Sequence, residues 1–457
     1  MSSGRNCQPK IQVLELFSGI GGVHYALEES GIPHEVVAAV DINDQANAVY
    51  RHNFPGTKLM QRCIESLTLK ELNHLSPDLI HMSPPCQPFT RVGKQQDSAD
   101  KRTKSFFCIL ELLPKLAKRP PYILVENVKG FETSDTRNSL IAILDSCGYV
   151  VQEMLLSPVQ FGIPNSRLRY YLLAKLSPLR FHFPTSSELQ TELPECVTTS
   201  FLHHGKTSAS CHCMKRHSID ETLAADKYQR RDGCFDHERH CGEAGDTETS
   251  DTSGPGLVTS CETIVTSDLT ECDHSGSRLT DSDASVQAIP SASVGQVDVP
   301  LYEKYAHRCG TLADYLEHEQ GEYFTPYLLP EKFFRRVWSM DLVTANVRHS
   351  CCFTKRYGHH VEGAGSVFQM NTVITTNLDK YKTTDHKDDV HFLDAVRTLK
   401  LRYFTPREIA NLMGFPTSFT FPDGVSPIQC YRLLGNSLNV HVVSVLLRLL
   451  TADDSNC

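Results

Sequence analysis

The residue that most directly predicts chemistry is Cys86, which lies between Pro85 and Pro88 in the stretch "SPPCQPFTR". Proline fixes its own φ angle and restricts the residue before it, so this proline-rich loop is stiff. The loop follows the apolar run Leu79–Met82 and is therefore expected at the carboxyl end of a strand, where open α/β sheets bind ligands. The pattern predicts a thiol positioned as a nucleophile; a proline-rich turn with an incidental cysteine is the plainer alternative.

A carboxylate and two guanidinium groups accompany two later apolar runs. Glu126 follows Tyr122–Val125, where a carboxylate is costly unless it is paired or used for proton transfer. Arg167 and Arg169 occupy alternate positions at the entry to the run Tyr170–Ala174, so both point to the same face. Taken singly, each could be an ordinary ion-pair or capping residue. With the thiol loop, they predict one reactive site at strand ends.

A glycine-rich turn predicts a nucleoside-containing ligand. The stretch "LELFSGIGG", residues 14–22, leads from an apolar run into a helical pattern, and glycines let the backbone approach a ligand at a helix N-terminus. Further on, Asp41 ends the run "VVAAVD", where a carboxylate can bind ribose hydroxyls. The glycines lack the dinucleotide spacing G-x-G-x-x-G, so S-adenosyl-L-methionine fits better than a nicotinamide dinucleotide. A turn used only for packing is the alternative.

These candidate residues require a scaffold in which strands alternate with helices. That rhythm predicts an α/β fold with a doubly wound, mainly parallel sheet covered on both faces. The expected strands are Ile11–Leu16, Glu35–Val40, Leu79–Met82, Tyr122–Val125, Val150–Leu155 and Tyr170–Ala174. The expected helices are Val23–Ser30, Gln45–Asn53, Ser105–Ala117 and Arg137–Ser146.

Composition and charge divide the remainder of the chain. Residues 186–300 hold 20 acidic and 8 basic residues and are rich in Ser, Thr, Asp and Gly, which predicts a disordered insert. The rest holds 34 acidic and 37 basic residues and is compatible with a phosphate-bearing ligand, although the whole chain has a net charge of −9. The expected organisation is a catalytic domain over 1–185, the insert 186–300, a smaller domain over 301–398, and a segment 399–457 that returns to the catalytic domain through an amphipathic helix.

Cysteine usage predicts the compartment. Seventeen cysteines without regular spacing, and an N-terminus without an apolar segment, indicate the reducing cytosol or nucleus. No run approaches the roughly 18 apolar residues that a membrane span needs, so no membrane association is expected. The stretches "CHCMKRH" and "CFDHERHC" lack the paired C-x-x-C spacing of zinc modules, and no metal is expected.

Five stretches, in chain order, resemble the motifs of the cytosine-C5 methyltransferases: "LELFSGIGG", "SPPCQPFTR", "ENVKGF", "QFGIPNSRLRYY" and "YRLLGNSLNVHVV". Residues 350–358, "SCCFTKRYG", resemble the signature of the branch that methylates transfer RNA, and the position of the first motif near residue 11 is also similar to that branch. The resemblance implies a Rossmann-like class I methyltransferase fold with a smaller target-recognition domain. The protein is expected in the cytoplasm and the nucleus.

The resemblance also implies catalytic roles. Cys86 would add as a thiolate to C6 of cytosine and so make C5 nucleophilic, and Glu126 would contact N3 and the exocyclic amine. Arg167 would orient the base, and Arg169 would support the same pocket. No residue is implied as the base for the C5 proton.

A set of cofactor contacts is implied in the same way. S-adenosyl-L-methionine, which reacts to S-adenosyl-L-homocysteine, would be held by Phe17, Ser18, Gly19, Ile20, Gly22, Asp41, Ile42, Ile64, Pro85, Asn436 and Ser437. The chain departs from the family pattern at Cys63, where many relatives have an acidic residue at the position expected to contact the adenine amine.

The implied substrate is a cytosine at position 38 in the anticodon loop of aspartate tRNA, and the chain is expected to act as a monomer. A single-stranded loop suits this chemistry because unstacking a base costs less there than in a duplex. The expected RNA contacts are Arg91, Lys94, Lys101, Arg102, Lys104, Cys352, Lys355 and Arg356. The alternatives are a solvated basic face for the five basic residues that follow the cysteine loop and a packing role for Cys352.

Three alternatives remain at this point. A DNA cytosine-C5 methyltransferase would use the same catalytic residues, and DNA is expected as a possible but weaker substrate. An RNA-binding relative with weak catalysis would have no need of the stiff thiol loop. A nicotinamide oxidoreductase is disfavoured by the glycine spacing.

Overall fold

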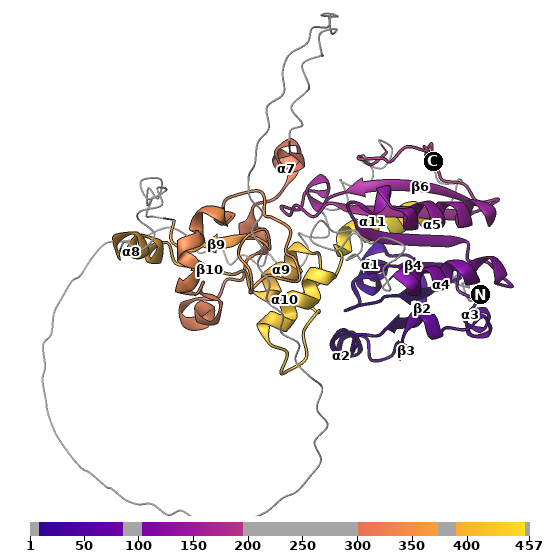
Figure 1. Ribbon diagram of the computed structural model, residues 1–457, viewed down its shortest axis with the longest axis horizontal. Coiled ribbons are helices and arrows are strands. Elements are labelled where there is room, and N and C mark those ends of the chain that lie inside the picture. The colour runs from indigo at the N-terminus through magenta and orange to yellow at the C-terminus, as the bar shows by residue number, and fades with distance from the viewer. Residues whose placement is uncertain (1–8, 86–102, 195–299, 373–389, 453–457) are drawn as a thin grey trace, which may run out of the picture. The chain divides into compact units, whose positions relative to one another are not determined.

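A seven-stranded sheet forms the centre of the larger part of the protein (Figure 1). The computed structural model describes residues 9–85, 103–194, 300–372 and 390–452, all within one unit of the chain. The strand order is β3-β2-β1-β4-β5-β7-β6. The bounds are β1 Ile11–Leu16, β2 His34–Asp41, β3 Leu59–Gln61, β4 Leu79–Met82, β5 Tyr122–Val128, β6 Tyr149–Leu156 and β7 Arg169–Leu176.

Strand directions bring the predicted site residues to one edge. Strands β1 to β5 pair in parallel, whereas β7 pairs antiparallel with both β5 and β6. The start of β7 therefore lies beside the end of β5, with Arg169 opposite Val128. This mainly parallel, helix-covered sheet confirms the predicted Rossmann-like fold class.

Helices cover the two faces of the sheet because successive strand residues point to opposite sides. In β1, Val13 packs into the core shared with α1 and α11, and Leu14 into the core shared with α4 and α5. The helices of this part are α1 Gly22–Ser30, α2 Asp44–Asn53, α3 Leu69–Leu75, α4 Lys104–Leu112, α5 Asp135–Ser146 and α11 Val440–Thr451. Short 3₁₀ turns join them: η1 Ile64–Ser66, η4 Leu113–Lys115, η5 Phe131–Thr133 and η6 Pro158–Phe161.

The last helix is more deeply buried than its predicted amphipathic pattern implied. In α11 only His441, Arg448 and Thr451 are partly exposed, and the other nine residues are buried. It contacts α1, β5 and β7, so the C-terminal segment completes the helical layer over one face. The stretch Pro427–Thr451 is long and apolar enough to cross a membrane, but 72% of the residues in its apolar 18-residue window are buried inside the protein, which explains that composition.

A smaller part is built from short strands and 3₁₀ turns. Its sheet has the order β10-β9-β8. The elements are α7 Leu301–Tyr305, η7 Ala306–Arg308, η8 Leu312–Tyr315, η9 Gly321–Tyr327, η10 Glu331–Ser339, β8 Leu342–Val343, β9 Val367–Gln369, α8 Val390–Thr398, β10 Leu401–Arg402, α9 Pro406–Leu412 and α10 Pro427–Asn436. Segment 399–457 contributes to both parts, because β10 pairs with β9 while α11 packs on α1. Of the predicted insert 186–300, residues 195–299 lie outside the described residues, whereas Gln190 exchanges backbone hydrogen bonds with Glu153 and Leu155 of β6.

A buried ion pair holds the smaller part together. Arg402 is 2% exposed, and its two terminal nitrogens donate to both carboxylate oxygens of Glu408 at 2.7 and 2.8 Å. The guanidinium carbon lies 4.3 Å from the ring centroid of Phe324 and 4.5 Å from that of Phe368. The aromatic faces and the carboxylate together offset the cost of burying this charge.

We expect Glu408→Gln to lower the free energy of unfolding by about 3–5 kcal/mol, because it leaves Arg402 buried without a counter-charge. Urea unfolding measures the loss. The matched control is Glu331→Gln, which removes the carboxylate facing Arg397 in a pair whose side chains are 43% and 64% exposed. That variant should lose only about 0–1 kcal/mol, and equal losses in the two variants would contradict the argument.

Candidate active site

The end of β5 places Glu126 beside the segment that leads into the thiol loop. Strand β4 ends at Met82, which pairs with Val125, and the side-chain amide of Asn127 donates to the carbonyl oxygen of Pro84 at 3.4 Å. Residues 83–85 are therefore held against the strand that carries the carboxylate. Cys86 itself lies outside the described residues, so its role remains a prediction.

Glu126 is a buried carboxyl group with cations beside it. Its residue is 9% exposed, and one carboxylate oxygen lies 3.5 Å from Nε of Arg169. Burial raises the pKa of this carboxyl, and the nearby guanidinium groups of Arg169 and Arg167 and a hydrogen bond from Ser83 oppose the rise without cancelling it. The group can therefore exist in its acid form at a higher pH than an exposed glutamate.

The two arginines act differently in the structure. Arg167 is 4% exposed and donates to the carbonyl oxygens of Phe353, Gly435 and Ser437. Arg169 is the guanidinium that faces Glu126. Arg167 therefore joins the segment that leads into β7 to the smaller part and to the end of α10, whereas Arg169 is placed to act on the carboxyl group.

Cys352 lies between these two arginines. Its sulfur is 3.5 Å from Nη1 of Arg167 and 3.8 Å from Nη2 of Arg169. Burial opposes ionisation of this thiol, but the two positive charges outweigh it, and the pKa of Cys352 lies below its ordinary value. The predicted residues Glu126, Arg167, Arg169 and Cys352 thus come together in one cluster.

The cluster depends on a close backbone approach at the end of α10. A Cβ atom added to Gly435 would lie 2.2 Å from the backbone nitrogen of Lys355 and 2.3 Å from the carbonyl carbon of Thr354. Only glycine permits this contact, which real Cβ atoms essentially never show. Gly435 therefore lets the segment that carries Cys352 lie directly on the helix whose end receives Arg167.

The glycine turn forms a second site at the ends of β1 and β2. The backbone N–H of Gly19 donates to Oδ2 of Asp41 at 2.9 Å, and that of Asn43 donates to Oδ1 at 2.8 Å. Phe17 has a φ of 57°, a strained value for a residue with a side chain, and a Cβ added to Gly19 would meet nothing within 4 Å. The carboxylate thus braces a turn with open space above it.

Other predicted cofactor residues surround this turn. Ile42 exposes 68% of its surface, and the buried hydroxyl of Ser18 has no hydrogen-bond partner in the described part of the chain. A Cβ on Gly22 would lie 3.0 Å from the hydroxyl of Ser437, so the C-terminal segment reaches the turn. Ile20 and Ile64 are buried in the core, Asn436 is exposed, and Pro85 is half-buried at the end of its described segment. The carboxylate of Glu65 accepts hydrogen bonds from Cys63 and Ser105.

The predicted RNA contacts are only partly described. Lys104 begins α4 and is exposed, Lys355 is half-buried, and Arg356 is exposed. Arg91, Lys94, Lys101 and Arg102 lie outside the described residues. The two cysteine and histidine stretches of the insert also lie there, and within the described ranges no three His, Cys, Asp or Glu side chains gather as a metal site.

Sequence reasoning missed the residues that support the cluster. Asn127 and Ser83 flank the carboxyl site, and the hydroxyl of Ser157 accepts from the backbone N–H of Arg167. Asn127 follows the predicted Glu126 in "ENV", and Gly435 precedes the predicted Asn436 in "LLGNS". Their position beside predicted site residues is the one feature of the sequence that could have identified them. Ser157 is ten residues from Arg167 and carried no signal.

Comparison with known proteins places this geometry in a family. The family described as C-5 cytosine-specific DNA methylase matches residues 11–451. The chain is 42% identical over 442 residues to a human protein named tRNA (cytosine(38)-C(5))-methyltransferase, covering 96% of this chain and 99% of that one. It is 34% identical over 446 residues to a Dictyostelium discoideum DNA (cytosine-5)-methyltransferase, covering 97% and 95%.

Solved structures agree with this placement. A Spodoptera frugiperda DNMT2 mutant is 33% identical, with a TM-score of 0.66 and coverage of 97% of this chain and 100% of that one. Schizosaccharomyces pombe Dnmt2 is 30% identical, with a TM-score of 0.61 and coverage of 97% and 98%. These matches confirm the resemblance inferred from five motifs and remove the oxidoreductase alternative. The chain belongs to the C-5 cytosine-specific DNA methylase family and is a cytosine-C5 methyltransferase.

Proposed function

We propose that this enzyme transfers a methyl group from S-adenosyl-L-methionine to C5 of cytosine 38 in the anticodon loop of aspartate tRNA, through a covalent adduct with Cys86. The observation that carries the catalytic part is the cluster of Glu126, Arg169, Arg167 and Cys352 beside the segment that enters the thiol loop. The RNA substrate is supported by the human and Spodoptera frugiperda relatives named for cytosine 38 of tRNA, at 42% and 34% identity. The choice of aspartate tRNA rests on the family resemblance.

The residues fit a sequence of proton and thiol steps. The Cys86 thiolate adds to C6 of the ring, and a proton held on Glu126 at N3 balances the charge that develops there. Burial favours this acid form of Glu126, and Arg169 holds the carboxyl group in place. Once C5 carries the methyl group, loss of the C5 proton and elimination of the Cys86 thiolate release the methylated base, and the N3 proton returns to Glu126.

The glycine turn fits the cofactor. Both oxygens of Asp41 accept backbone N–H groups and keep further lone pairs for ribose hydroxyls. The exposed Ile42 offers an apolar face to the adenine, and the unpaired hydroxyl of Ser18 offers a polar contact above the turn. When bound, S-adenosyl-L-methionine supplies an electrophilic methyl group.

The first experiment measures transfer of labelled methyl groups to total tRNA and to duplex DNA by the wild-type enzyme and Cys86→Ala. We expect label in one tRNA, at cytosine 38, and none with the variant. An RNA carrying 5-fluorocytosine at position 38 should trap a covalent adduct that survives SDS. The fluorine replaces the C5 hydrogen that is normally lost as a proton, and it cannot leave as a cation. The adduct should be absent from Cys86→Ala, and a trapped adduct that persists in this variant would contradict the assignment of the thiol.

A DNA substrate is the second candidate, favoured by the Dictyostelium discoideum relative named as a DNA methyltransferase. Label mainly in DNA would establish that alternative. RNA binding without label in either polymer would instead identify a binding protein with weak catalysis.

A further inference from the structure

A cavity of about 270 Å³ lies in the smaller part of the protein, away from the cluster around Glu126. Four segments line it: η9 with the residues before it, the start of α9, the chain between α9 and α10, and the start of α10. Specific small-molecule pockets begin at roughly 300 Å³, so this space suits one aromatic heterocycle rather than a larger ligand. None of the residues that line it takes part in the proposed methyl transfer.

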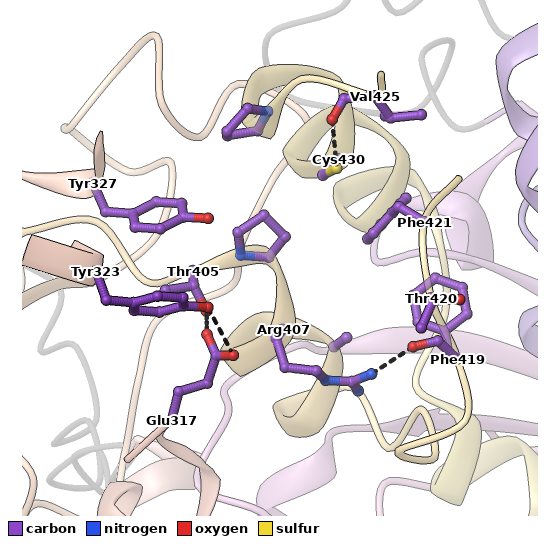
Figure 2. A pocket seen from close by; sticks show the side chains of 13 residues that line it. Glu317, Tyr323, Tyr327, Thr405, Arg407, Phe419, Thr420, Phe421, Val425 and Cys430 are labelled. Atoms are coloured by element: carbon purple, nitrogen blue, oxygen red, sulfur yellow. Dashed lines mark hydrogen bonds between the residues drawn. The ribbon is translucent and has the colours of Figure 1, made fainter. Parts of the chain in front are cut away.

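Aromatic rings form much of the lining (Figure 2). Tyr323 and Tyr327 lie on one side with their hydroxyl ends toward the cavity, and Phe419 and Phe421 lie across from them. Tyr323 is 40% exposed, an unusual exposure for a large ring at a cavity wall. Aromatic side chains of this kind bind single nucleobases by stacking, with little dependence on the base.

The polar groups at the cavity offer mainly hydrogen-bond acceptors. The carboxylate of Glu317 accepts from the hydroxyls of Tyr323 at 3.0 Å and Thr405 at 2.5 Å, and it interacts electrostatically with Arg407, which lines the same cavity. The hydroxyl of Tyr327 makes no hydrogen bond to any described residue. Arg407 is occupied, because its nitrogens donate to Asn411 and to the carbonyl oxygens of three residues, Phe415, Pro416 and Phe419. A planar ligand with N–H donors complements this lining.

One helix connects the cavity with the catalytic cluster. Pro427 and Cys430, at the start of α10, line the cavity, while the carbonyl oxygens of Gly435 and Ser437, at its end, receive Arg167. At 1.5 Å per residue the ten steps from Pro427 to Ser437 span roughly 15 Å. About four stacked nucleotides cover that distance at 3.4 Å each. A few nucleotides of an RNA strand therefore span the length of α10, from the end that receives Arg167 to the end that lines the cavity.

We propose that the cavity binds a second unstacked nucleobase of the RNA substrate, with its ring against Tyr323 and Tyr327 and its exocyclic amino group toward Glu317. The proposal rests on the proposed RNA substrate and adds a specificity site to it. A carboxylate placed to face an exocyclic group accepts from the amino groups of cytosine, adenine and guanine, whereas the exocyclic groups of uracil are carbonyl acceptors and its one donor is the ring N3–H. The site therefore selects an amino-bearing base within a few nucleotides of the target.

A lysine or arginine side chain from a partner protein would also complement the carboxylate of Glu317 and the aromatic rings of this cavity. The nucleobase is favoured because the cavity is aromatic on both sides and lies one helix from the catalytic cluster. The partner protein becomes an outcome of the test.

The test uses the full-length enzyme, Tyr327→Ala, the control Tyr327→Phe, and tRNAs that each lack one base in the anticodon loop. We expect Tyr327→Ala to weaken binding of intact tRNA roughly 5- to 150-fold, the loss typical of one base–aromatic stack, and Tyr327→Phe to bind like the wild type. On one particular abasic tRNA, wild type and Tyr327→Ala should bind equally. When uracil is placed at that position, Glu317→Gln should bind the tRNA as well as the wild type does. When an amino-bearing base is placed there, Glu317→Gln should bind the tRNA more weakly than the wild type does.

Unchanged tRNA affinity in Tyr327→Ala would overturn the proposal, as would the same loss on every abasic tRNA. Unchanged tRNA affinity in Tyr327→Ala, combined with binding of a lysine-rich peptide by the wild type but not by this variant, would indicate that the cavity binds a partner protein. Thermal unfolding of each variant identifies a loss caused by misfolding, and Tyr323→Ala then serves as a second stacking variant. If the wild type methylates no tRNA, the proposed function fails, and that result is distinct from failure of the cavity variants.

Discussion

Glu126→Gln is expected to lower kcat for methyl transfer by roughly 10²- to 10⁴-fold, the range for loss of one general acid. The amide can still accept and donate hydrogen bonds at the ring, but it cannot hold a transferable proton at N3. Burial raises the pKa of Glu126, so the acid form persists to a higher pH than in an exposed glutamate. This form is lost as the pH rises through the raised pKa. The wild-type enzyme should therefore lose activity on the alkaline side for this reason, and the variant should lack that limb of the profile.

The measurement is a pH profile of kcat for both proteins under single-turnover conditions. Glu153→Gln is the matched control, because Glu153 is also a strand carboxylate, 6% exposed, but pairs with Arg137 and Tyr170 away from the site. That variant should be less stable and keep the wild-type profile. An unchanged alkaline limb in Glu126→Gln would assign the titration to another group.

Gly435→Ala should reduce kcat/KM by about 10²-fold or more, the effect of misplacing a catalytic group by about 1 Å. The added carbon would meet backbone atoms of Thr354 and Lys355, which cannot rotate away as a side chain could. The segment with Cys352 and the end of α10 must separate. Arg167 then loses the sulfur of Cys352, the carbonyl oxygen of residue 435, or both, as hydrogen-bond acceptors. Alanine is intrinsically the better helix former by about 1 kcal/mol, so any loss comes from this contact.

Initial rates over a range of tRNA concentrations measure the effect. Gly56→Ala is the control, since a Cβ there meets nothing within 4 Å and its φ lies outside the left-handed region. We expect this control to match the wild type. Near-normal kcat/KM in Gly435→Ala would mean that the two segments can separate without displacing Arg167.

The sequence predicted best where a short pattern determines the structure. The strands β1 and β4 have the predicted bounds. Glu126 and Arg169 meet at one edge because β7 runs antiparallel to β5, so that the start of β7 lies beside the end of β5. The strand β3 and the helix α3 were not predicted, because three and seven residues give too little periodicity. Elements of that length are specified by their neighbours in the fold.

Contacts between distant segments could not be predicted from local pattern. Arg167 bonds to the carbonyl oxygen of Ser437, 270 residues later in the chain, and it therefore serves as a joint as well as a predicted base-orienting residue. Arg402 is fully buried although arginines are mostly exposed, because three aromatic rings and Glu408 converge on it. Both outcomes depend on tertiary packing.

The position of α11 on α1 also determines when the enzyme can finish folding on the ribosome. Residues 22–30 form one of the first helices, but their partner helix begins at Val440, about 410 residues later. At 5–20 residues per second, roughly 20 to 80 s separate the synthesis of the two helices. During that interval the apolar faces of α1, β5 and β7 have no covering helix, so the nascent chain presents a surface for chaperones until translation is nearly complete.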